Sequence, residues 1–274
     1  MYMKLVVLDG YTENPGDLDW RGMEALGDLT VYARTDHSQV KERMQDADAV
    51  IINKVPMTRE LMQESKQLRY IGVLATGYDV VDIEAASDLH IAVTNVPGYG
   101  TDTVAQYAIA LLLEVTSRIG HHAKRVKEGE WANNADWCFW DYPLMELSGR
   151  TMGIIGFGRI GRKVAEIAQA LGMHVLFHDA HADNDTHAEK VSLEELLRRS
   201  DVVSLHCPLT KENDSLINKA TLALMKSNAI LINNARGKLI NEYDLAQALQ
   251  NGTIYAAALD VFSDRFEIPD AAGT

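Results

Sequence analysis

Cysteine is nearly absent from this sequence, since Cys138 and Cys207 are the only two in 274 residues. So few cysteines exclude a disulfide framework and a cysteine-based zinc cluster. Basic residues are also in deficit, with 26 lysines and arginines against 39 acidic residues and a formal net charge of −13. A chain this acidic is a poor partner for nucleic acid, so we expect none.

Long apolar runs are lacking as well. The opening MYMKLVVLDGY has no basic segment followed by a long apolar stretch, so we predict no signal peptide. No other stretch is long and apolar enough to cross a bilayer, so no membrane association is expected. No pair of histidines has metal-ligand spacing, and His121 and His122 are expected on a solvated basic helix, so no metal is predicted. Together these absences favour a cytoplasmic protein.

The most informative stretch runs from residue 151 to residue 179. Ile154 and Ile155 close a short apolar strand, and Gly156, Gly158 and Gly161 follow in the pattern G-x-G-x-x-G. A helix and a second strand come next, and the second strand ends at Asp179. The first glycine permits a tight turn, the second lets the backbone approach a pyrophosphate, and the third lets the helix pack closely on the strand.

This order of elements predicts a dinucleotide site rather than a purely structural glycine turn. The N-terminus of the helix offers N–H groups and a positive dipole end to phosphates. Asp179 can accept hydrogen bonds from a ribose. It favours NAD over NADP because its carboxylate would meet the 2′-phosphate of NADP, and no Arg or Lys follows it closely.

Strands alternate with helices along the whole chain, which predicts parallel sheets. The length suggests two domains, and we place their boundary at the Pro97-Gly98 turn, giving residues 1–98 and 99–274. The expected strands are 4–8, 29–32, 49–52, 70–74, 91–94, 151–155, 174–178, 201–206, 229–233 and 255–261. The expected helices are 18–26, 39–44, 58–65, 104–115, 160–171, 192–198, 220–224 and 242–250.

Several polar groups follow strands at their carboxyl ends, where open α/β sheets bind ligands. Arg236 is aimed at such a cleft and can grip a carboxylate with two hydrogen bonds, although it could also be an ordinary surface arginine. Asp260 could accept from a nicotinamide carboxamide, or merely cap its loop. The turn at 75–77 can bind a carboxylate through its N–H groups, unless it is an ordinary glycine turn. His206 is more consistent with a strand end near adenosine than with a catalytic base.

Trp131, Trp137, Phe139 and Trp140 lie in an irregular segment after a long helix. So much aromatic surface predicts burial, either against a second subunit or within the same chain.

Taken together, six stretches resemble the D-isomer-specific 2-hydroxyacid dehydrogenases. They are ATGYDVVD (75–82), NVPGYGTDTVAQYAIALLL (95–113), LSGRTMGIIGFGRIGRKVA (147–165), DVVSLHCPLT (201–210), NNARGKLINE (233–242) and AAALDVF (256–262). Within that family the chain looks most like the glycerate dehydrogenase or hydroxypyruvate reductase group, to which the opening VVLDGYTENPGDLDW contributes.

The resemblance implies an α/β protein of two Rossmann-like domains with parallel sheets, namely a flavodoxin-like substrate domain and an NAD-binding Rossmann domain. It implies hydride transfer between NAD and a 2-hydroxy or 2-oxo acid, in a homodimer with the helix after Pro97 in its interface. Arg236 would orient the substrate, and the amides of Ala75, Thr76 and Gly77 would hold its carboxylate. The implied cofactor residues are Thr76, Gly156, Gly158, Arg159, Ile160, Gly161 and Asp179, then Cys207, Pro208 and Asn213 beside the adenosine, and Asn234, Ala235, Arg236 and Asp260 at the nicotinamide end.

The end of the chain departs from the family pattern. After Asp-Val-Phe the family has Glu-Pro and, further on, a histidine that donates a proton. Here Ser263 follows, and Glu267 is the nearest acid before a proline. Glu267 would need a strongly raised pKa to replace that histidine. We therefore expect an incomplete chain that lacks the family's terminal helix and has weak or no activity. The alternative is an NAD(H)-binding sensor or corepressor on the same scaffold.

Overall fold

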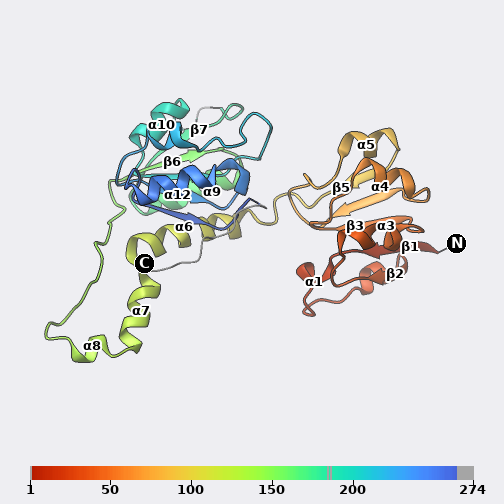
Figure 1. Ribbon diagram of the computed structural model, residues 1–274, viewed down its shortest axis with the longest axis horizontal. Helices are drawn as coiled ribbons and strands as arrows, with labels where there is room; N and C mark the ends of the chain where they lie inside the picture. Colours follow the sequence, from red (N-terminus) through yellow and green to blue (C-terminus); the bar gives the residue numbers. More distant parts are fainter. Residues whose placement is uncertain (1, 184, 186, 264–274) are drawn as a thin grey trace. The chain divides into compact units, whose positions relative to one another are not determined.

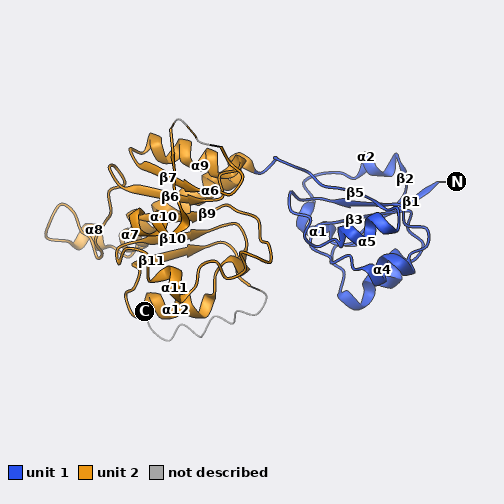
Figure 2. Ribbon diagram, turned by 90° about the horizontal axis from the view of Figure 1, so that it is seen from above, with its two compact units in different colours: residues 1–100 blue, residues 101–274 orange. Residues whose placement is uncertain are grey.

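The computed structural model describes residues 2–183, 185 and 187–263, which fall into two compact units, 1–100 and 101–274 (Figure 2). The units are joined where β5 ends and α6 begins (Figure 1). Both contain an open sheet in which every paired strand is parallel. The predicted fold class is therefore confirmed.

The first unit has a five-stranded sheet in the order β2-β1-β3-β4-β5. Its buried core lies between one face of the sheet and the helices α3 to α5. The elements are β1 Met3–Val7, α1 Gly10–Glu13, α2 Arg21–Glu24, β2 Gly27–Val31, the 3₁₀ helix η1 His37–Gln39, α3 Val40–Met44, β3 Ala49–Ile52, α4 Arg59–Glu64, β4 Tyr70–Val73, α5 Ile83–Asp88 and β5 Ala92–Thr94.

The second unit has a six-stranded sheet in the order β11-β10-β9-β6-β7-β8. One apolar core joins the sheet to α6 and α9, and another joins its opposite face to α10, α11 and α12 (Figure 2). The elements are α6 Thr101–Ser117, α7 Ile119–Lys127, α8 Glu130–Asn133, β6 Thr151–Ile155, α9 Arg159–Ala170, β7 His174–His178, β8 Glu189–Lys190, α10 Leu193–Arg199, β9 Val202–Leu205, α11 Lys219–Leu222, β10 Ile230–Asn233, the 3₁₀ helix η2 Gly237–Leu239, α12 Glu242–Gln250 and β11 Ala256–Leu259.

The predicted helix 18–26 is wrong in its first half. The Asn14 side chain accepts from the N–H groups of Gly16 and Leu18, both at 3.1 Å, and donates to the Leu18 carbonyl at 2.8 Å. These local bonds replace the helical pattern, as asparagine side chains often do. Within residues 18–26, only Arg21–Glu24 becomes helical. The helix α5, which Asp82 caps through the Ala85 N–H, was not predicted.

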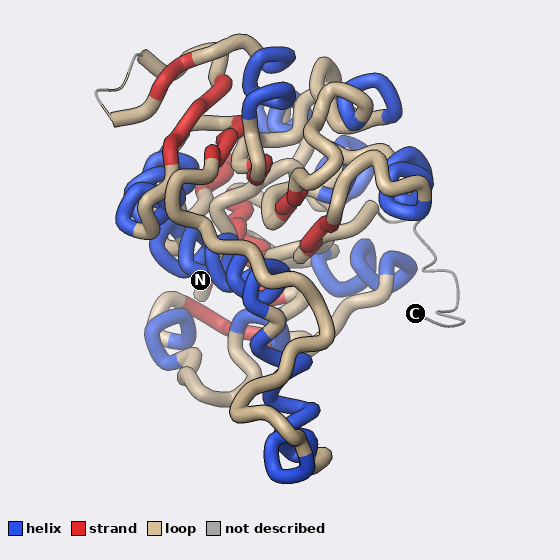
Figure 3. The backbone as a smooth tube through the Cα atoms, turned by 90° about the vertical axis from the view of Figure 1, so that its left-hand side faces the viewer, coloured by secondary structure: helices blue, strands red, loops and turns tan. Residues whose placement is uncertain are grey.

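The expectation that His121 and His122 are solvated is also wrong. Both side chains are half-buried on α7, which together with α8 and residues 134–146 extends away from the sheet of its unit (Figures 1 and 3). We call residues 119–146 the arm. His121 Nε2 lies 2.5 Å from Asp141 Oδ2, and the His122 ring packs edge-on against Phe139. In the described part of the chain, no helix is long and apolar enough to cross a bilayer.

Asp201 joins the starts of three strands in the second unit. Its buried carboxylate accepts from the Thr151 N–H and from Lys226 Nζ, each at 2.9 Å, and its carbonyl accepts from the Ile230 N–H. Burial opposes ionisation, but the Lys226 ammonium and the Thr151 N–H outweigh it and lower the pKa of Asp201. The carboxylate is therefore better stabilised in the folded chain than in the unfolded one.

We predict that Asp201→Asn destabilises the protein by about 2 kcal/mol at neutral pH, because a charge-assisted hydrogen bond is lost. The folded pKa lies below the unfolded value of about 4, so the stabilisation is present above that pH and disappears as the pH falls through the folded pKa. Urea unfolding at pH 7 and at pH 3 measures both effects, with Asp17→Asn, on an exposed loop, as the control. Equal stability of Asp201→Asn and wild type at pH 7 would contradict this account.

Candidate functional site

Five strand ends of the second unit share one edge of its sheet. Because the strands are parallel and in register, Gly156, Asp179, Cys207, Asn234 and Asp260 follow β6, β7, β9, β10 and β11 at the same edge. The chain runs from β6 outward to β7 and then returns to β9 on the other side of β6. A ligand crevice forms at such a switch point.

The turn from β6 into α9 depends on two glycines. Gly156 has φ +94°, and a Cβ there would lie 2.4 Å from the Cys207 nitrogen at the end of β9. A Cβ on Gly161 would lie 2.2 Å from the Gly156 oxygen. Neither position can hold a side chain without moving backbone, so the two glycines bring strand, helix and neighbouring strand end into contact.

Gly158 meets a different requirement. A Cβ there would have no atom within 4 Å, so nothing in the protein itself excludes a larger residue. Gly158 is also the N-cap of α9 and makes no side-chain capping bond, which leaves the first-turn N–H groups to other acceptors. Arg159 is exposed and Ile160 half-buried in that turn. This open, uncapped helix N-terminus fits the pyrophosphate of a dinucleotide.

Asp179 accepts three backbone hydrogen bonds. Oδ2 accepts from the Phe157 N–H at 2.7 Å, and Oδ1 accepts from His181 and Ala182 at 2.7 and 2.8 Å. Burial opposes the charge, but these donors prevail and lower the pKa of Asp179. The carboxylate thus ties the glycine turn to the end of β7 and is ionised at neutral pH.

The segment after β9 is held by Asn213. Its Oδ1 accepts from the Thr210 N–H at 2.7 Å, and its Nδ2 donates to the Pro208 carbonyl at 2.8 Å. Asn213 therefore shapes the loop that carries Cys207 and Pro208. Burial raises the pKa of the Cys207 thiol to about 11, which leaves it protonated and unreactive.

His206 makes a 2.8 Å hydrogen bond between Nε2 and Ser204 Oγ. Burial lowers the pKa of His206 to about 4, so its ring is neutral near pH 7 and cannot serve as an acid.

The loop after β10 carries Arg236. Asn233, fully buried, accepts from the Ala235 N–H at 3.0 Å through Oδ1 and donates to the Arg236 carbonyl at 2.9 Å through Nδ2. Asn234 donates to the Val104 carbonyl at 2.9 Å. Arg236 is half-buried, and its Nη1 lies 2.8 Å from the Ala235 carbonyl. Asp260 is exposed, and its N–H donates to the Asn233 carbonyl.

In the first unit, the turn after β4 pairs its backbone carbonyls but not its backbone N–H groups. The Ala75 carbonyl accepts from the Val96 N–H, the Thr76 carbonyl from Asn95 Nδ2, and Thr76 Oγ1 donates to the Val96 carbonyl. Among the described residues, no hydrogen bond uses the N–H groups of Ala75, Thr76 or Gly77. Consecutive unpaired N–H groups are the donors that a carboxylate needs.

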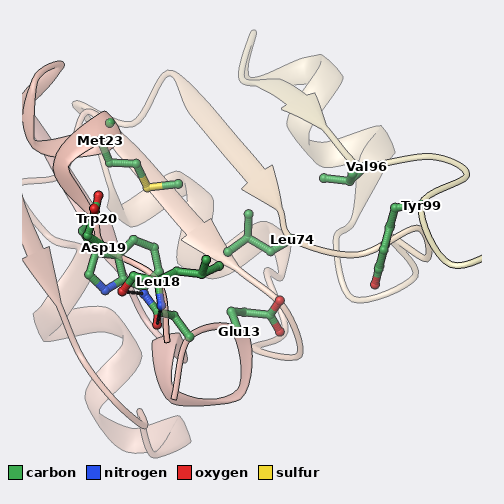
Figure 4. A pocket seen from close by; sticks show the side chains of 10 residues that line it. Glu13, Leu18, Asp19, Trp20, Met23, Leu74, Val96 and Tyr99 are labelled. Carbon is green, nitrogen blue, oxygen red and sulfur yellow. Dashed lines mark hydrogen bonds between the residues drawn. The ribbon is translucent and has the colours of Figure 1, made fainter. Parts of the chain in front are cut away.

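A cavity of about 400 Å³ also lies in the first unit (Figure 4). Its wall is mostly apolar, with Leu18, Trp20, Met23, Leu74 and Val96, and Glu13 projects toward it. Burial and the neighbouring charge of Asp9 raise the pKa of Glu13. A cavity with acidic rather than basic groups does not fit a substrate carboxylate, so the anchors are better sought at the turn 75–77 and at Arg236.

Comparison with known proteins decides the family. A model of the D-isomer specific 2-hydroxyacid dehydrogenase NAD binding domain matches residues 109–272. Hydroxypyruvate reductase of Blautia hydrogenotrophica is 54% identical over 267 residues, covering 95% of this chain and 83% of that protein. The chain belongs to the D-isomer-specific 2-hydroxyacid dehydrogenases.

Two further relatives agree with this membership. Glycerate dehydrogenase of Methylorubrum extorquens is 41% identical over 223 residues, covering 81% of this chain and 70% of that protein. The structure of D-lactate dehydrogenase from Aquifex aeolicus, complexed with NAD and lactic acid, superposes with a TM-score of 0.79 at 33% identity, covering 95% of this chain and 77% of that chain. The chain is thus an NAD-dependent D-2-hydroxyacid dehydrogenase, and the predicted family, enzyme class and cofactor are confirmed.

The roles of individual residues in this dehydrogenase stay predictions. The structure gathers the predicted cofactor residues of the second unit along one sheet edge, while Ala75, Thr76 and Gly77 belong to the first unit. Glu267 lies outside the described residues. The bonds of Asn233 within the Arg236 loop were not predicted from the sequence. The signal in the sequence was that Asn233 is a polar residue at the end of an otherwise apolar strand.

We expect this dehydrogenase to bind NADH more tightly than NADPH. We predict that Asp179→Asn lowers the ratio of the NADPH to the NADH dissociation constant by about tenfold, because roughly 1.4 kcal/mol of charge repulsion is lost. Asparagine is the informative substitution because it keeps one acceptor for the backbone donors, whereas alanine keeps none. Fluorescence titration of both cofactors measures the ratio, with ADP-ribose as a control for an intact adenosine site. An unchanged ratio would show that Asp179 does not set the preference.

Proposed function

We propose that this dehydrogenase reduces a short 2-oxo acid, of the hydroxypyruvate or glyoxylate type, to the D-2-hydroxy acid with NADH. The relatives named hydroxypyruvate reductase and glycerate dehydrogenase support this substrate class. The observation that most directly supports this proposal is the position of Arg236. It is a half-buried arginine on a hydrogen-bonded loop, at the edge of the second sheet where the strands end. We assign residues 1–98 to the substrate domain and 99–274 to the NAD-binding domain.

Each proposed anchor supplies a different kind of donor. Arg236 offers a planar fork that can bind the carboxylate in two places and polarise the adjacent carbonyl. In the first unit, the consecutive N–H groups of Ala75, Thr76 and Gly77 are suited to hold a carboxylate. NADH supplies the hydride when bound, and the positive charge of Arg236 would stabilise the negative charge that develops on the carbonyl oxygen.

The test is NADH oxidation dependent on hydroxypyruvate or glyoxylate, followed at 340 nm. We predict that Arg236→Lys lowers kcat/KM by about 10²-fold, because a lysine point charge replaces a bidentate pair and roughly 3 kcal/mol is lost. NADH affinity should stay within about twofold, which a parallel titration checks. The comparison of Arg236→Lys with wild type is made in a version of the chain extended with the family's Glu-Pro, histidine and terminal helix, since we expect weak or no activity without them. Full activity of Arg236→Lys would exclude Arg236 from the substrate site. NADH binding without turnover even by the extended wild type would favour the sensor alternative.

We also propose that the protein is a homodimer whose interface includes the arm. Three tryptophans of the arm are largely exposed, namely Trp131 at 60%, Trp137 at 86% and Trp140 at 68%. The described part of the chain therefore does not bury them. The arm is nevertheless ordered by its own contacts, since Arg125 pairs with Asp141 at 3.2 Å and with Glu130 at 2.7 Å. An ordered segment with large exposed aromatic side chains is typical of a subunit interface.

We predict that the double substitution Trp137→Ser and Trp140→Ser raises the dimer dissociation constant by at least about 10²-fold, since buried interface tryptophans contribute roughly 2 kcal/mol or more each. Sedimentation velocity over a concentration series measures the change. Tyr243→Ser is the matched control, because Tyr243 is 72% exposed but lies on α12, outside the arm. A wild-type monomer at every concentration would exclude the proposed dimer.

A further inference from the structure

The loop that carries Arg236 begins with two asparagines that act differently. Among the described residues, the Asn233 side chain bonds only within the loop, to Ala235 and Arg236. The Asn234 side chain instead reaches a residue 130 positions earlier, where its Nδ2 donates to the Val104 carbonyl at 2.9 Å. One asparagine therefore shapes the loop, and the other attaches the loop to a separate element.

That element is the first turn of α6. Val104 is the fourth residue of this helix, which begins at Thr101 and packs against β10 and β11 within the same unit. Ala105, Ala108 and Ile109 are buried in the core beneath it. Because α6 is fixed by this packing, a hydrogen bond to its first turn gives the Arg236 loop a rigid reference point.

Among the described residues, only one of the two polar atoms of the Asn234 amide, Nδ2, makes a hydrogen bond. Its Oδ1 is buried and has no hydrogen-bond partner within residues 2–183, 185 and 187–263. Rotating the amide would set this oxygen against the Val104 carbonyl, so the contact itself assigns Nδ2 as the donor. A buried acceptor left unpaired costs stability, and such exceptions concentrate where function requires a particular geometry.

We propose that Asn234 is a positioning residue for substrate binding, which holds the Arg236 loop against α6 so that the guanidinium meets the substrate carboxylate. The inference rests on the proposed role of Arg236. Only Ala235 separates the two residues, and the Arg236 backbone is extended, with φ −144° and ψ 135°. A shift of the loop therefore moves the guanidinium directly, and a displacement of about 1 Å can lower binding or rate by up to about 10²-fold.

The experiment measures binding of oxamate, an unreactive 2-oxo acid analogue, to the protein saturated with NADH. Asn234→Asp keeps the shape of the side chain but sets a carboxylate oxygen against the Val104 carbonyl. We expect oxamate to bind about tenfold more weakly at pH 7.5, while affinity for ADP-ribose, which lacks the nicotinamide, stays at the wild-type value. As the pH falls and the new carboxyl group takes up a proton, it can donate again, so the deficit relative to wild type should shrink.

Asn218→Asp is the matched control. Asn218 Nδ2 also donates to a backbone carbonyl at 2.9 Å, that of Ser215, and its Oδ1 caps α11, which aspartate can do as well. This variant loses an equivalent hydrogen bond at Ser215, whose N–H in turn bonds to the Lys238 carbonyl just beyond Arg236, and it should bind oxamate like wild type. Asn234→Ala removes the donor without adding repulsion, so its oxamate affinity should lie between those of wild type and Asn234→Asp. This variant still tests the inference if Asn234→Asp does not fold.

Two results would overturn the inference about Asn234 without affecting the proposed role of Arg236. One is wild-type oxamate affinity in Asn234→Asp or Asn234→Ala beside a clear loss in Arg236→Lys. The other is a parallel loss of ADP-ribose and oxamate affinity, which would mean general damage to the unit. If wild type does not bind oxamate, or Arg236→Lys binds it equally well, the proposed role of Arg236 fails and the inference fails with it.

Discussion

The close approach of backbone at the end of β6 is the constraint on which the second unit depends. Gly156 touches the end of β9, and the Gly156 carbonyl touches Gly161 in the first turn of α9. Both contacts require the absence of a Cβ, so a strand, a helix N-terminus and a neighbouring strand end converge at one point. The convergence leaves open space at Gly158, where we propose that the pyrophosphate of the dinucleotide binds.

Side chains that bond to backbone hold the remaining loops of this edge. Asp179 joins the glycine turn to the end of β7, Asn213 shapes the segment after β9, and Asn233 shapes the Arg236 loop. Each side chain satisfies backbone groups that the sheet can no longer pair once its strands have ended. Loops held in this way need less ordering when a ligand binds.

Both units have an open parallel sheet with a point at which the strand order reverses, but the two sheets differ in the hydrogen bonds made there. In the first unit the switch point lies at β1, but the carboxylate of Asp9 accepts there from the N–H groups of Asn53 and Lys54, which closes it. The N–H groups left available follow β4 instead, at residues 75–77. Topology alone therefore indicates where a ligand can bind, while local hydrogen bonding decides where donors remain.

Sequence alone determined the features that arise from local chemistry. The spacing of Gly156, Gly158 and Gly161, with Asp179 ending the next strand, predicted the cofactor fold because each task depends on residues close together in the chain. The alternation of strands and helices predicted both parallel sheets, because a parallel pair needs a crossover connection.

Tertiary structure decided what depends on distant partners. Residues 18–20 favoured a helix by pattern, but Asn14 held them in a loop, and the interactions of His121 depended on Asp141, 20 residues away. The bond from Asn234 to Val104 spans 130 residues and has no local signature. Such contacts follow from which backbone groups remain unpaired after the sheet forms, and that is settled only when the whole unit has packed.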